Sequence, residues 1–476
     1  MSIPVISIAQ MREWEQASWA AGKSEAEVIR QVGRILAREA LRLTKPDDTI
    51  LILAGKGHNG DDARCAREHL LERQVELLDV RHAETDAPKI EALLRSRPAL
   101  VIDGLFGIGL NRSLDDAWIK LIELINDSKL PVLAVDVPSG LNADSGEPQG
   151  AAIKAAATLT IGAPKIGLVE HHATDYVGQL IVARDIGLVN CTHDSHLNWT
   201  LPEDFRDFPP RRPVEGHKGT FGHLAILAGS RGYHGAAVLA ARGAQRAQPG
   251  LITLFPQENV YVPVASQLQS TMVHPWSPET KLPGKFSAVL IGPGLASSDV
   301  SEELKDTVRR VWREADVPVI VDASALNWLP TTSGPKDSVR VITPHPGEAA
   351  RLLNISAADV QDDRLSAIRE ISRQFENIWV VLKGHQTMVG RCDDPIFINC
   401  SGNPFLGQGG SGDTLSGFLA GLLAQPALQE DPALTIRYAV WQHGAAADLL
   451  TRTQSNWIVE DLIETLGSVR ATSVQP

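Results

Sequence analysis

A glycine-rich run that ends in a carboxylate is the sharpest chemical signal in the sequence. It reads Gly409-Gly410-Ser411-Gly412-Asp413, and an apolar run with helical spacing follows it. Glycines let the backbone approach a ligand closely, and the first turn of a helix presents free amides at the positive end of its dipole. Such a loop stabilises the charge of a transferring phosphoryl group, while Asp413 can act as a general base. The alternative is a flexible turn in which Asp413 only caps a helix.

Four further polar loops follow apolar runs in the same half of the chain. They lie at 229–236, 292–295, 343–348 and 383–387. In an open α/β sheet, ligands bind beyond the carboxyl ends of the strands, so we expect these loops to meet the glycine-rich run in one crevice. Each loop alone is a weak signal, but together at corresponding strand ends they favour an active site.

Three polar turns in the N-terminal half also follow apolar runs. The first, at 55–62, is rich in glycine, as in many phosphate-binding turns between a strand and a helix. The others begin at Asp103 and Asp136. Their carboxylate and amide oxygens suit acid/base work or a hard cation rather than zinc. The alternative is that each aspartate only caps a loop.

The elements that must position these residues form two α/β series, because short apolar runs alternate twice with helical stretches after a helical segment at 9–43. Several runs are apolar throughout, as expected for strands buried on both faces of a parallel sheet. The expected strands are 49–54, 75–80, 100–103, 131–136, 158–161 and 179–183 in the first series, and 222–228, 251–255, 288–291, 317–321, 341–343, 378–382 and 395–399 in the second.

A stretch rich in proline and charge at 204–213 separates the two series and is expected to be an interdomain linker. A chain of 476 residues is also too long for one hydrophobic core. The sequence therefore predicts an α/β fold with two domains, one at 1–203 and one at 214–476.

The composition argues against a nucleic-acid or membrane partner. The formal net charge is -12, whereas phosphate backbones require clustered Lys and Arg. The most apolar stretch, at 415–424, is far shorter than a membrane span. The four cysteines lack metal-ligand spacing, which suits a reducing compartment, and the N-terminus has no signal-peptide pattern. We therefore expect a cytoplasmic protein.

The C-terminal motifs resemble the ADP/ATP-dependent NAD(P)H-hydrate dehydratase family, which has a ribokinase-like α/β fold. The resemblance rests on the order of HKG at 217–219, GPGL at 292–295, TPHPGE at 343–348, KGxxT at 383–387 and GxGDxLxG at 410–417. It implies that the hydrated nicotinamide nucleotide contacts Ala236, Gly294, His345 and Asp413. It also implies that the adenine nucleotide is held by Lys383, Gly384, His385, Gln386, Thr387 and Gly412.

This resemblance implies a lyase that uses ADP, or ATP, with Mg²⁺. Asp413 would take the proton of the hydroxyl at C6 of the reduced nicotinamide, the hydroxyl would be phosphorylated, and phosphate would then leave to restore NADH or NADPH. Two alternatives stay open. One is a ribokinase-fold kinase of a small alcohol with a non-catalytic N-terminal binding domain, and the other is a nucleotide-binding sensor without turnover.

The N-terminal motifs resemble the NAD(P)H-hydrate epimerase family, whose domain is a Rossmann-like α/β/α sandwich. The resemblance rests on GxGxNGxD at 55–62, DxxFGxG at 103–109 and VDxPSGL at 135–141. It implies that Asn59, Asp103 and Ser139 bind K⁺ and that Asp136 is catalytic, stabilising a transient cation while the R and S hydrates interconvert. The implied substrate contacts are His58, Asn59, Gly60, Asp61, Asp62, Gly107, Ile108, Gly109, Leu110, Asn111, Arg112, Ser113 and Asp136.

One departure from the epimerase pattern concerns Asp61, which stands where the family has a glycine. If that position requires a positive φ, an aspartate there is strained. It also places a negative charge near a phosphate-bearing substrate. A weakened epimerase or a substrate-binding scaffold therefore stays open for this half. Because ribokinase-like cores often self-associate, we expect a homo-oligomer.

Overall fold

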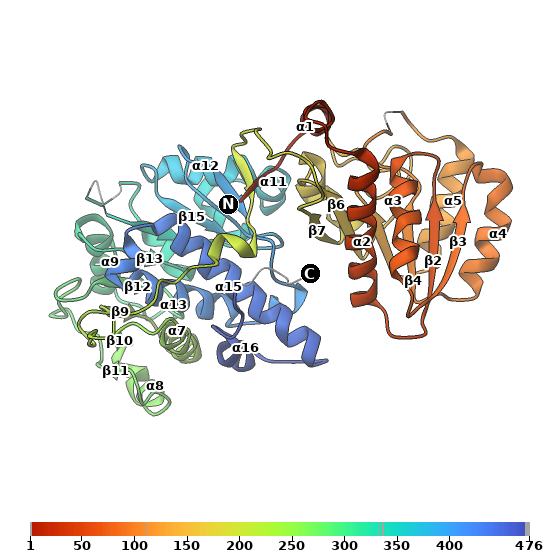
Figure 1. Cartoon of the computed structure of the whole chain (residues 1–476). Helices are drawn as coiled ribbons and strands as arrows, with labels where there is room; N and C mark the ends of the chain where they lie inside the picture. Colours follow the sequence, from red (N-terminus) through yellow and green to blue (C-terminus); the bar gives the residue numbers. More distant parts are fainter. Residues whose placement is uncertain (1, 111, 333, 336–337, 472–476) are drawn as a thin grey trace. The chain divides into compact units, whose positions relative to one another are not determined.

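The computed structural model describes residues 2–471 except 111, 333, 336 and 337. Its internal contacts divide the chain into two compact units, one at 3–195 and one from residue 196 onward (Figure 1). Each unit contains a sheet of mainly parallel strands with helices on its faces, which confirms the predicted α/β class. No described helix combines the length and the apolar character needed to cross a membrane.

The N-terminal unit has one parallel sheet with the strand order β3-β2-β4-β5-β6-β7. Helices α2 and α3 cover one face, and α4 and α5 cover the other (Figure 1). The elements are β1 (Ile3–Pro4), α1 (Ile8–Ala20), α2 (Glu25–Leu43), β2 (Thr49–Ala54), α3 (His58–Ala66), β3 (Gln74–Asp79), α4 (Ala83–Arg95), β4 (Leu100–Gly104), α5 (Asp116–Asp127), β5 (Val132–Val135), β6 (Ala157–Ile161), α6 (Thr174–Val177) and β7 (Gln179–Ala183).

Strand β2 shows why its sequence is apolar throughout. Ile50 and Ile52 pack into the core under α2 and α3, while Leu51 and Leu53 pack into the core under α4 and α5. Successive side chains of a strand point to opposite faces, so a sheet covered on both sides needs apolar residues at every position.

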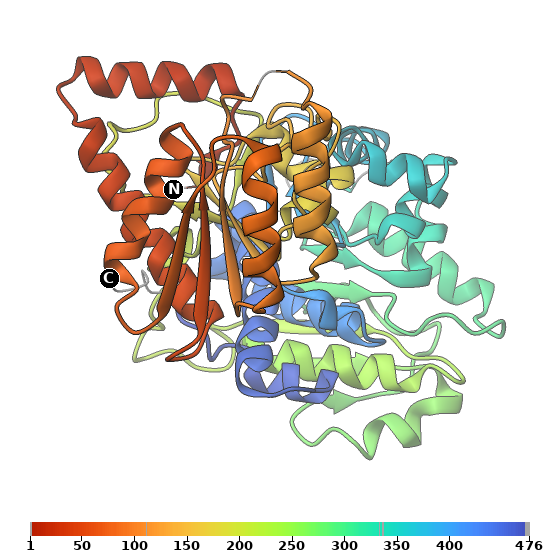
Figure 2. The same ribbon diagram turned by 90° about the vertical axis from the view of Figure 1, so that its right-hand side faces the viewer.

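The C-terminal unit has a sheet with the strand order β8-β17-β16-β15-β14-β13-β12-β9-β10-β11, in which only β16 runs antiparallel to its neighbours. Helices α7, α13, α15 and α16 share one core with one face of it (Figure 2). The strands are β8 (Leu197–Trp199), β9 (His223–Leu227), β10 (Leu251–Phe255), β11 (Met272–Val273), β12 (Ala288–Ile291), β13 (Val319–Val321), β14 (Arg340–Ile342), β15 (Trp379–Leu382), β16 (Met388–Gly390) and β17 (Ile396–Ile398). The helices are α7 (His234–Ala247), α8 (Tyr261–Ala265), α9 (Glu302–Glu314), α10 (Pro346–Leu353), α11 (Ala357–Asp362), α12 (Arg364–Gln374), α13 (Ser411–Leu423), α14 (Pro426–Gln429), α15 (Pro432–Thr453) and α16 (Val459–Thr465).

The segment expected to link the domains packs instead on the C-terminal unit. Strand β8 pairs with β17, so the division between the units falls before residue 196 rather than at 204–213. Phe205 is fully buried against the rings of Tyr438 and Trp441, and Asp204 forms an ion pair with Arg437. The segment 204–213 is rich in proline and charged residues, as linkers often are, but its aromatic side chains pack against α15.

Both sheets reverse their strand order at one point. In the N-terminal unit β2 lies between β3 and β4, and in the C-terminal unit β9 lies between β10 and β12. Right-handed crossovers then leave a crevice at the carboxyl ends of these strands, where open α/β sheets bind ligands. The polar turns after β2 and β4, and those after β9 and β12, lie at these two points.

Candidate functional sites

The glycine-rich turn of the N-terminal unit leads directly into a helix. Helix α3 begins at His58, so all of 58–62 belongs to its first turns. The expected strain at Asp61 is absent, because this residue has a helical backbone and not a positive φ. Its carboxylate instead accepts a 2.8 Å hydrogen bond from Arg64 Nη1. The positions that require glycine are others: a Cβ at Gly55 would lie 2.1 Å from the carbonyl oxygen of Leu105.

Oxygen atoms from three strand ends gather beside this helix. Asp103 accepts hydrogen bonds from the backbone amide (2.8 Å) and the hydroxyl (2.6 Å) of Ser139. Asn59 Nδ2 donates to the carbonyl of Phe106 at 3.0 Å, while Asn59 Oδ1 is buried without a partner. A buried oxygen without a donor fits a nearby cation, and burial raises the pKa of Asp103 to about 6 despite its hydrogen bonds.

This group contains the three residues expected to bind K⁺ and one further oxygen that could bind a cation, the carbonyl oxygen of Phe106. The sequence did not predict this oxygen, because every residue has a main-chain carbonyl whatever its side chain. One carboxylate with neutral oxygens suits a large monovalent cation better than zinc. The described residues contain no cluster of three or more His, Cys, Asp or Glu side chains that could hold a metal ion.

Asp136 follows β5 with a positive φ of 63° and is tied to a buried lysine. Lys165, which is fully buried, donates to Asp136 Oδ1 at 2.6 Å, to Thr160 Oγ1 at 3.1 Å and to the carbonyl of Ile161 at 2.8 Å. The backbone amide of Ile161 also donates to Asp136 Oδ1. Oδ1 therefore accepts from several donors, whereas Oδ2 makes no hydrogen bond to the residues that the structure describes, which leaves that oxygen for a ligand. Lys165 was missed in the sequence because it lies far from the aspartate along the chain.

A cavity of about 280 Å³ lies between α1, α2 and the start of α3. Glu15, His58 and Asp62 line it. Burial, followed by the charge of Asp136, raises the pKa of both Glu15 and Asp62. The mutual influence of these carboxylates shows that the cavity and Asp136 share one electrostatic site. Glu15 lies outside every motif and was not predicted.

The loop after β4 carries the remaining predicted substrate contacts of this unit. Gly107 approaches Asn59, since a Cβ at this glycine would lie 3.1 Å from Asn59 Oδ1. Ile108 packs beside the cluster around Met11 and Trp14 of α1. The loop continues through Gly109, Leu110, Arg112 and Ser113, none of which forms a hydrogen bond or ion pair with Asp136, and Asn111 lies outside the described residues.

In the C-terminal unit, the glycine-rich run forms the start of α13 as predicted. Gly410 has a φ of 98° and Asp413 lies in the first turn. A Cβ at Gly410 would also lie 2.4 Å from Leu239 Cδ1. Both the positive φ and this close contact therefore favour glycine at position 410. The first amides of the helix have no intrahelical acceptor and are available to an anion.

Asp413 faces a group of charged residues at the ends of β13, β14 and β15. Lys383 Nζ lies 2.8 Å from Asp322 Oδ1 and 3.9 Å from Glu348 Oε2. A Cβ at Gly412 would lie 3.4 Å from the same Nζ, which places the ammonium group beside the glycine-rich turn. Burial and then the charge of Asp322 raise the pKa of Asp413 to about 7, against the opposing effect of Lys383. Asp413 is thus a half-buried carboxylate whose nearby lysine is engaged by another aspartate.

The other predicted residues of this unit are the expected hydrate contacts and the expected nucleotide contacts. Among the hydrate contacts, Ala236 and Gly294 lie side by side, because a Cβ at Gly294 would lie 2.9 Å from Ala236 Cβ. His345 caps α10, and its amide donates to Glu348 Oε2 at 2.9 Å. The nucleotide contacts at 384–387 form the turn between β15 and β16, where Arg364 Nη1 donates to the carbonyl of His385 at 2.6 Å.

His443 of α15 contacts the main chain of the glycine-rich turn, and the sequence did not predict this residue. Its Nε2 lies 3.1 Å from the carbonyl oxygen of Ser411, and burial lowers its pKa to about 4. A neutral imidazole that donates through Nε2 satisfies this carbonyl without adding charge beside Asp413. A lone histidine inside the apolar pattern of α15 gave no sequence signal for this contact.

Comparisons with known proteins match both units of the chain. The family described as NAD(P)H-hydrate dehydratase matches residues 224–467, and the family described as YjeF-related protein N-terminus matches residues 79–167. The bifunctional NAD(P)H-hydrate repair enzyme Nnr of Coxiella burnetii is 35% identical over 465 residues, covering 92% of this chain and 93% of that protein. The Escherichia coli protein of the same name is 32% identical, covering 87% and 84%.

A solved structure extends the comparison. The ADP/ATP-dependent NAD(P)H-hydrate dehydratase from Bacillus subtilis, co-crystallised with ATP and Mg²⁺, is 33% identical with a TM-score of 0.51, covering 57% of this chain and 96% of that chain. Because the match to the repair enzymes spans nearly the whole chain and both units hold the expected clusters at their strand ends, this chain belongs to the family of bifunctional NAD(P)H-hydrate repair enzymes.

Proposed function

We propose that this chain repairs hydrated NADH and NADPH in two reactions. The N-terminal unit interconverts the R and S forms at C6 of the nicotinamide ring, and the C-terminal unit dehydrates the S form with ADP or ATP as phosphoryl donor. The observation that carries the proposal is Asp413, a half-buried carboxylate with a pKa of about 7 at the amide-rich start of α13.

In the dehydration, Asp413 takes the proton of the C6 hydroxyl while that oxygen attacks the terminal phosphorus of the nucleotide. The bridging P–O bond breaks, and AMP leaves from ADP, or ADP from ATP. A base with a pKa near the working pH combines a large deprotonated fraction with good basicity. The amides at 409–412 and the Lys383 ammonium stabilise charge on the transferred group. The ring nitrogen then expels phosphate, and loss of a C5 proton restores the dihydropyridine.

Magnesium fits the donor set of the C-terminal unit as an ion that arrives with the nucleotide. Mg²⁺ usually binds one or two carboxylates together with substrate phosphates, rather than a cage made only of protein ligands. Asp322 is engaged by Lys383, so Glu348 is the carboxylate best suited to hold it. The ion would neutralise charge on the phosphates during transfer.

In the epimerisation, the C6 hydroxyl leaves as water, the ring nitrogen carries the positive charge, and water returns to either face. The free Oδ2 of Asp136 stabilises that cation, while Lys165 keeps the carboxylate fixed through Oδ1. Glu15 and Asp62, whose pKa values are raised, can supply the proton for the departing hydroxyl. We propose His58–Asp62 and the loop 107–113 as substrate contacts.

Potassium is the proposed cation of the N-terminal unit, with Asn59, Asp103, Ser139 and the Phe106 carbonyl as ligands. The unpartnered Asn59 Oδ1 supports it. The ion would supply positive charge near the substrate phosphates and hold the 107–113 loop beside α3.

We further propose that the nucleotide is held by Lys383–Thr387 and Gly412, that the hydrate contacts Ala236, Gly294 and His345, and that the protein is a cytoplasmic homo-oligomer. The four cysteines are free, which suits a reducing compartment. Size-exclusion chromatography with light scattering tests the oligomeric state.

One experiment tests both reactions. Purified protein receives a mixture of R and S hydrates with ADP or ATP, and the near-UV absorbance of the dihydropyridine is followed together with free phosphate. Complete conversion with one phosphate per coenzyme supports both activities. Conversion of the S form alone would rule out the proposed epimerase activity. A product that keeps its phosphate would instead identify a kinase.

A further inference from the structure

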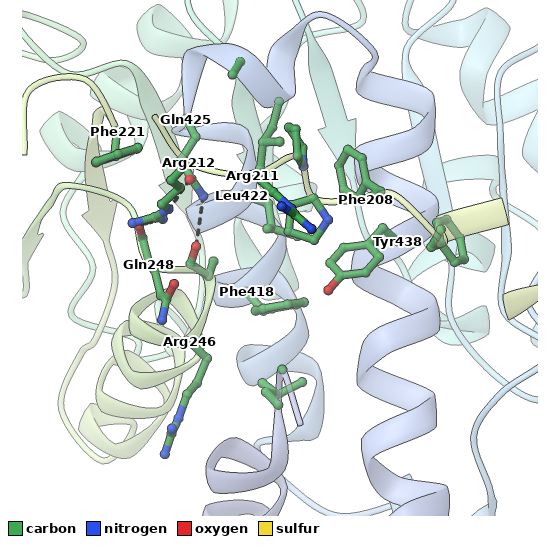
Figure 3. Close-up of a pocket in the computed structure, with 18 of the residues that line it drawn as sticks. Phe208, Arg211, Arg212, Phe221, Arg246, Gln248, Phe418, Leu422, Gln425 and Tyr438 are labelled. Carbon is green, nitrogen blue, oxygen red and sulfur yellow. Dashed lines mark hydrogen bonds between the residues drawn. The ribbon is translucent and has the colours of Figure 1, made fainter. Parts of the chain in front are cut away.

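A second cavity in the C-terminal unit lies away from Asp413 and takes no part in the reactions above. It is an open cavity with a volume of about 830 Å³, and it is lined by the segment 205–213, the ends of α7 and α13, Tyr438 of α15 and residues that follow α16 (Figure 3). The two α13 residues that line it, Phe418 and Leu422, are five and nine residues beyond Asp413, or about 8 and 14 Å along the helix axis.

The charge of this cavity is opposite to that of the chain. The chain has a formal net charge of -12, yet the cavity is lined by five arginines and a single acid, Glu464. The acid forms an ion pair with Arg246. Arg206 and Arg211 form no ion pair within the described part of the chain, so their charge is available to a ligand. The arginines are Arg206, Arg211, Arg212, Arg246 and Arg470.

The cavity wall is aromatic as well as basic. Arg212 is fixed over the ring of Phe221, 4.2 Å from its centroid, and donates to Gln425 Oε1 at 2.9 Å. Phe208 packs edge-on against Tyr438, with ring centroids 5.0 Å apart. Phe418 completes the wall beside Tyr438 (Figure 3). Flat rings and planar guanidinium groups together suit a flat, negatively charged molecule.

Tyr438 contributes a polar group to this wall. The residue is 8% exposed overall, and its hydroxyl opens to the cavity rather than being buried without a partner. The hydroxyl points toward Phe418 and the cavity (Figure 3). It therefore offers one hydrogen-bond donor to a ligand in the cavity. Burial raises the pKa of Tyr438 to about 12, so the group stays a donor.

We propose that this cavity binds a nucleoside phosphate, with the phosphate on the arginines and the base against the aromatic wall. The volume lies within the range of small-molecule sites, and both halves of such a ligand have matching groups in the wall. The cavity is a binding site and not a second active site, because its one carboxylate is neutralised by Arg246. The proposal is independent of the reactions of the two units.

The test is calorimetric titration of AMP into the full-length protein in the presence of one equivalent of AMP-PNP with Mg²⁺, which fills the C-terminal nucleotide site and leaves the cavity empty. We expect one further AMP per chain. Arg211→Glu should weaken this binding about tenfold or more, because it replaces a charge-assisted hydrogen bond with repulsion. Tyr438→Phe, which removes only the hydroxyl, should weaken it several-fold.

The matched control is Arg313→Glu, which reverses the charge of an exposed arginine on α9 and should bind AMP like the unaltered protein. Circular dichroism and thermal unfolding verify that each variant is folded. The absence of a second AMP, or equal binding by Arg211→Glu, would overturn the proposal. Inorganic phosphate that binds as tightly as AMP would overturn the role of the aromatic wall.

Discussion

In the N-terminal unit a buried lysine contacts the candidate catalytic aspartate itself, whereas in the C-terminal unit the corresponding lysine is engaged by a different aspartate. Lys165 lies 2.6 Å from Asp136, while Lys383 lies 2.8 Å from Asp322, and Asp413 forms no ion pair with any residue that the structure describes. Both units thus use one Lys–Asp pair at a strand end, but they place it differently relative to the reacting group.

The difference matches the chemistry proposed for each unit. A carboxylate that stabilises a cation must stay ionised and fixed, and a direct lysine contact serves this purpose. A general base must accept a proton, and the pKa of Asp413 is raised to about 7 by burial and by Asp322. Similar side chains therefore serve two roles because their surroundings differ.

The largest expected effect comes from Asp413→Asn, which removes the base. Dehydration should fall by about 10²–10⁴-fold, the usual contribution of general base catalysis. The measurement is the rate of absorbance recovery with pure S hydrate and nucleotide. Exchange between R and S hydrates without nucleotide, followed by chromatography, should be unchanged. Equal dehydration by the variant would contradict the role of Asp413.

Lys165→Met should destabilise the N-terminal unit by about 3–5 kcal/mol, because it leaves the buried Asp136 without its counter-charge. Denaturant unfolding measures the loss. The double variant Lys165→Met with Asp136→Asn should recover much of the stability but not the epimerisation. If the single and double variants are equally unstable, the loss of the Lys165–Asp136 ion pair does not explain the destabilisation. The contrast drawn between Lys165 and Lys383 would then be wrong.

Asp322→Asn should shift the pH dependence of dehydration. In the unaltered protein, kcat/KM for dehydration should fall tenfold for each pH unit below about 7, because Asp413 must be deprotonated to act as the base. Without the Asp322 charge, and with Lys383 released toward Asp413, the pKa of Asp413 falls by about one unit, so activity persists to lower pH. Stopped assays from pH 5 to 9 give the profile; an upward shift would reverse the assigned effect of Asp322.

Potassium should stabilise the N-terminal unit through the oxygen cluster. At a K⁺ concentration ten times its Kd, the gain is about 1.4 kcal/mol. Thermal unfolding in KCl and in NaCl at equal ionic strength measures it. Asn59→Ala should abolish the difference, and Asn403→Ala in the other unit should keep it. A K⁺ effect that survives Asn59→Ala places the ion elsewhere.

The smallest expected effect is that of Asp61→Gly. Asp61 is helical and half-exposed, and its charge is paired with Arg64, so its removal should change stability and epimerisation by no more than about 1 kcal/mol. Denaturant unfolding and R-to-S exchange measure both. A large gain in epimerisation would show that Asp61 does weaken this half.

The sequence by itself determined the fold class, most of the strands and the motifs at their ends. Continuous apolar runs such as 49–54 have few alternatives to a strand buried on both faces, and glycines followed by a polar run mark a strand-to-helix turn. These signals are local, so Asp413 at the start of α13 and Asp103 near the end of β4 were visible without coordinates.

Only the tertiary structure decided which groups surround those residues. Lys165, Asp322 and His443 lie outside the turns they serve, and the Phe106 carbonyl has no residue signature. The role of the 204–213 segment also required the fold, since the burial of Phe205 against α15 outweighs a linker-like composition. Charge and burial depend on neighbours that are distant in sequence, and therefore the electrostatic difference between Asp136 and Asp413 appears only once the strands are assembled.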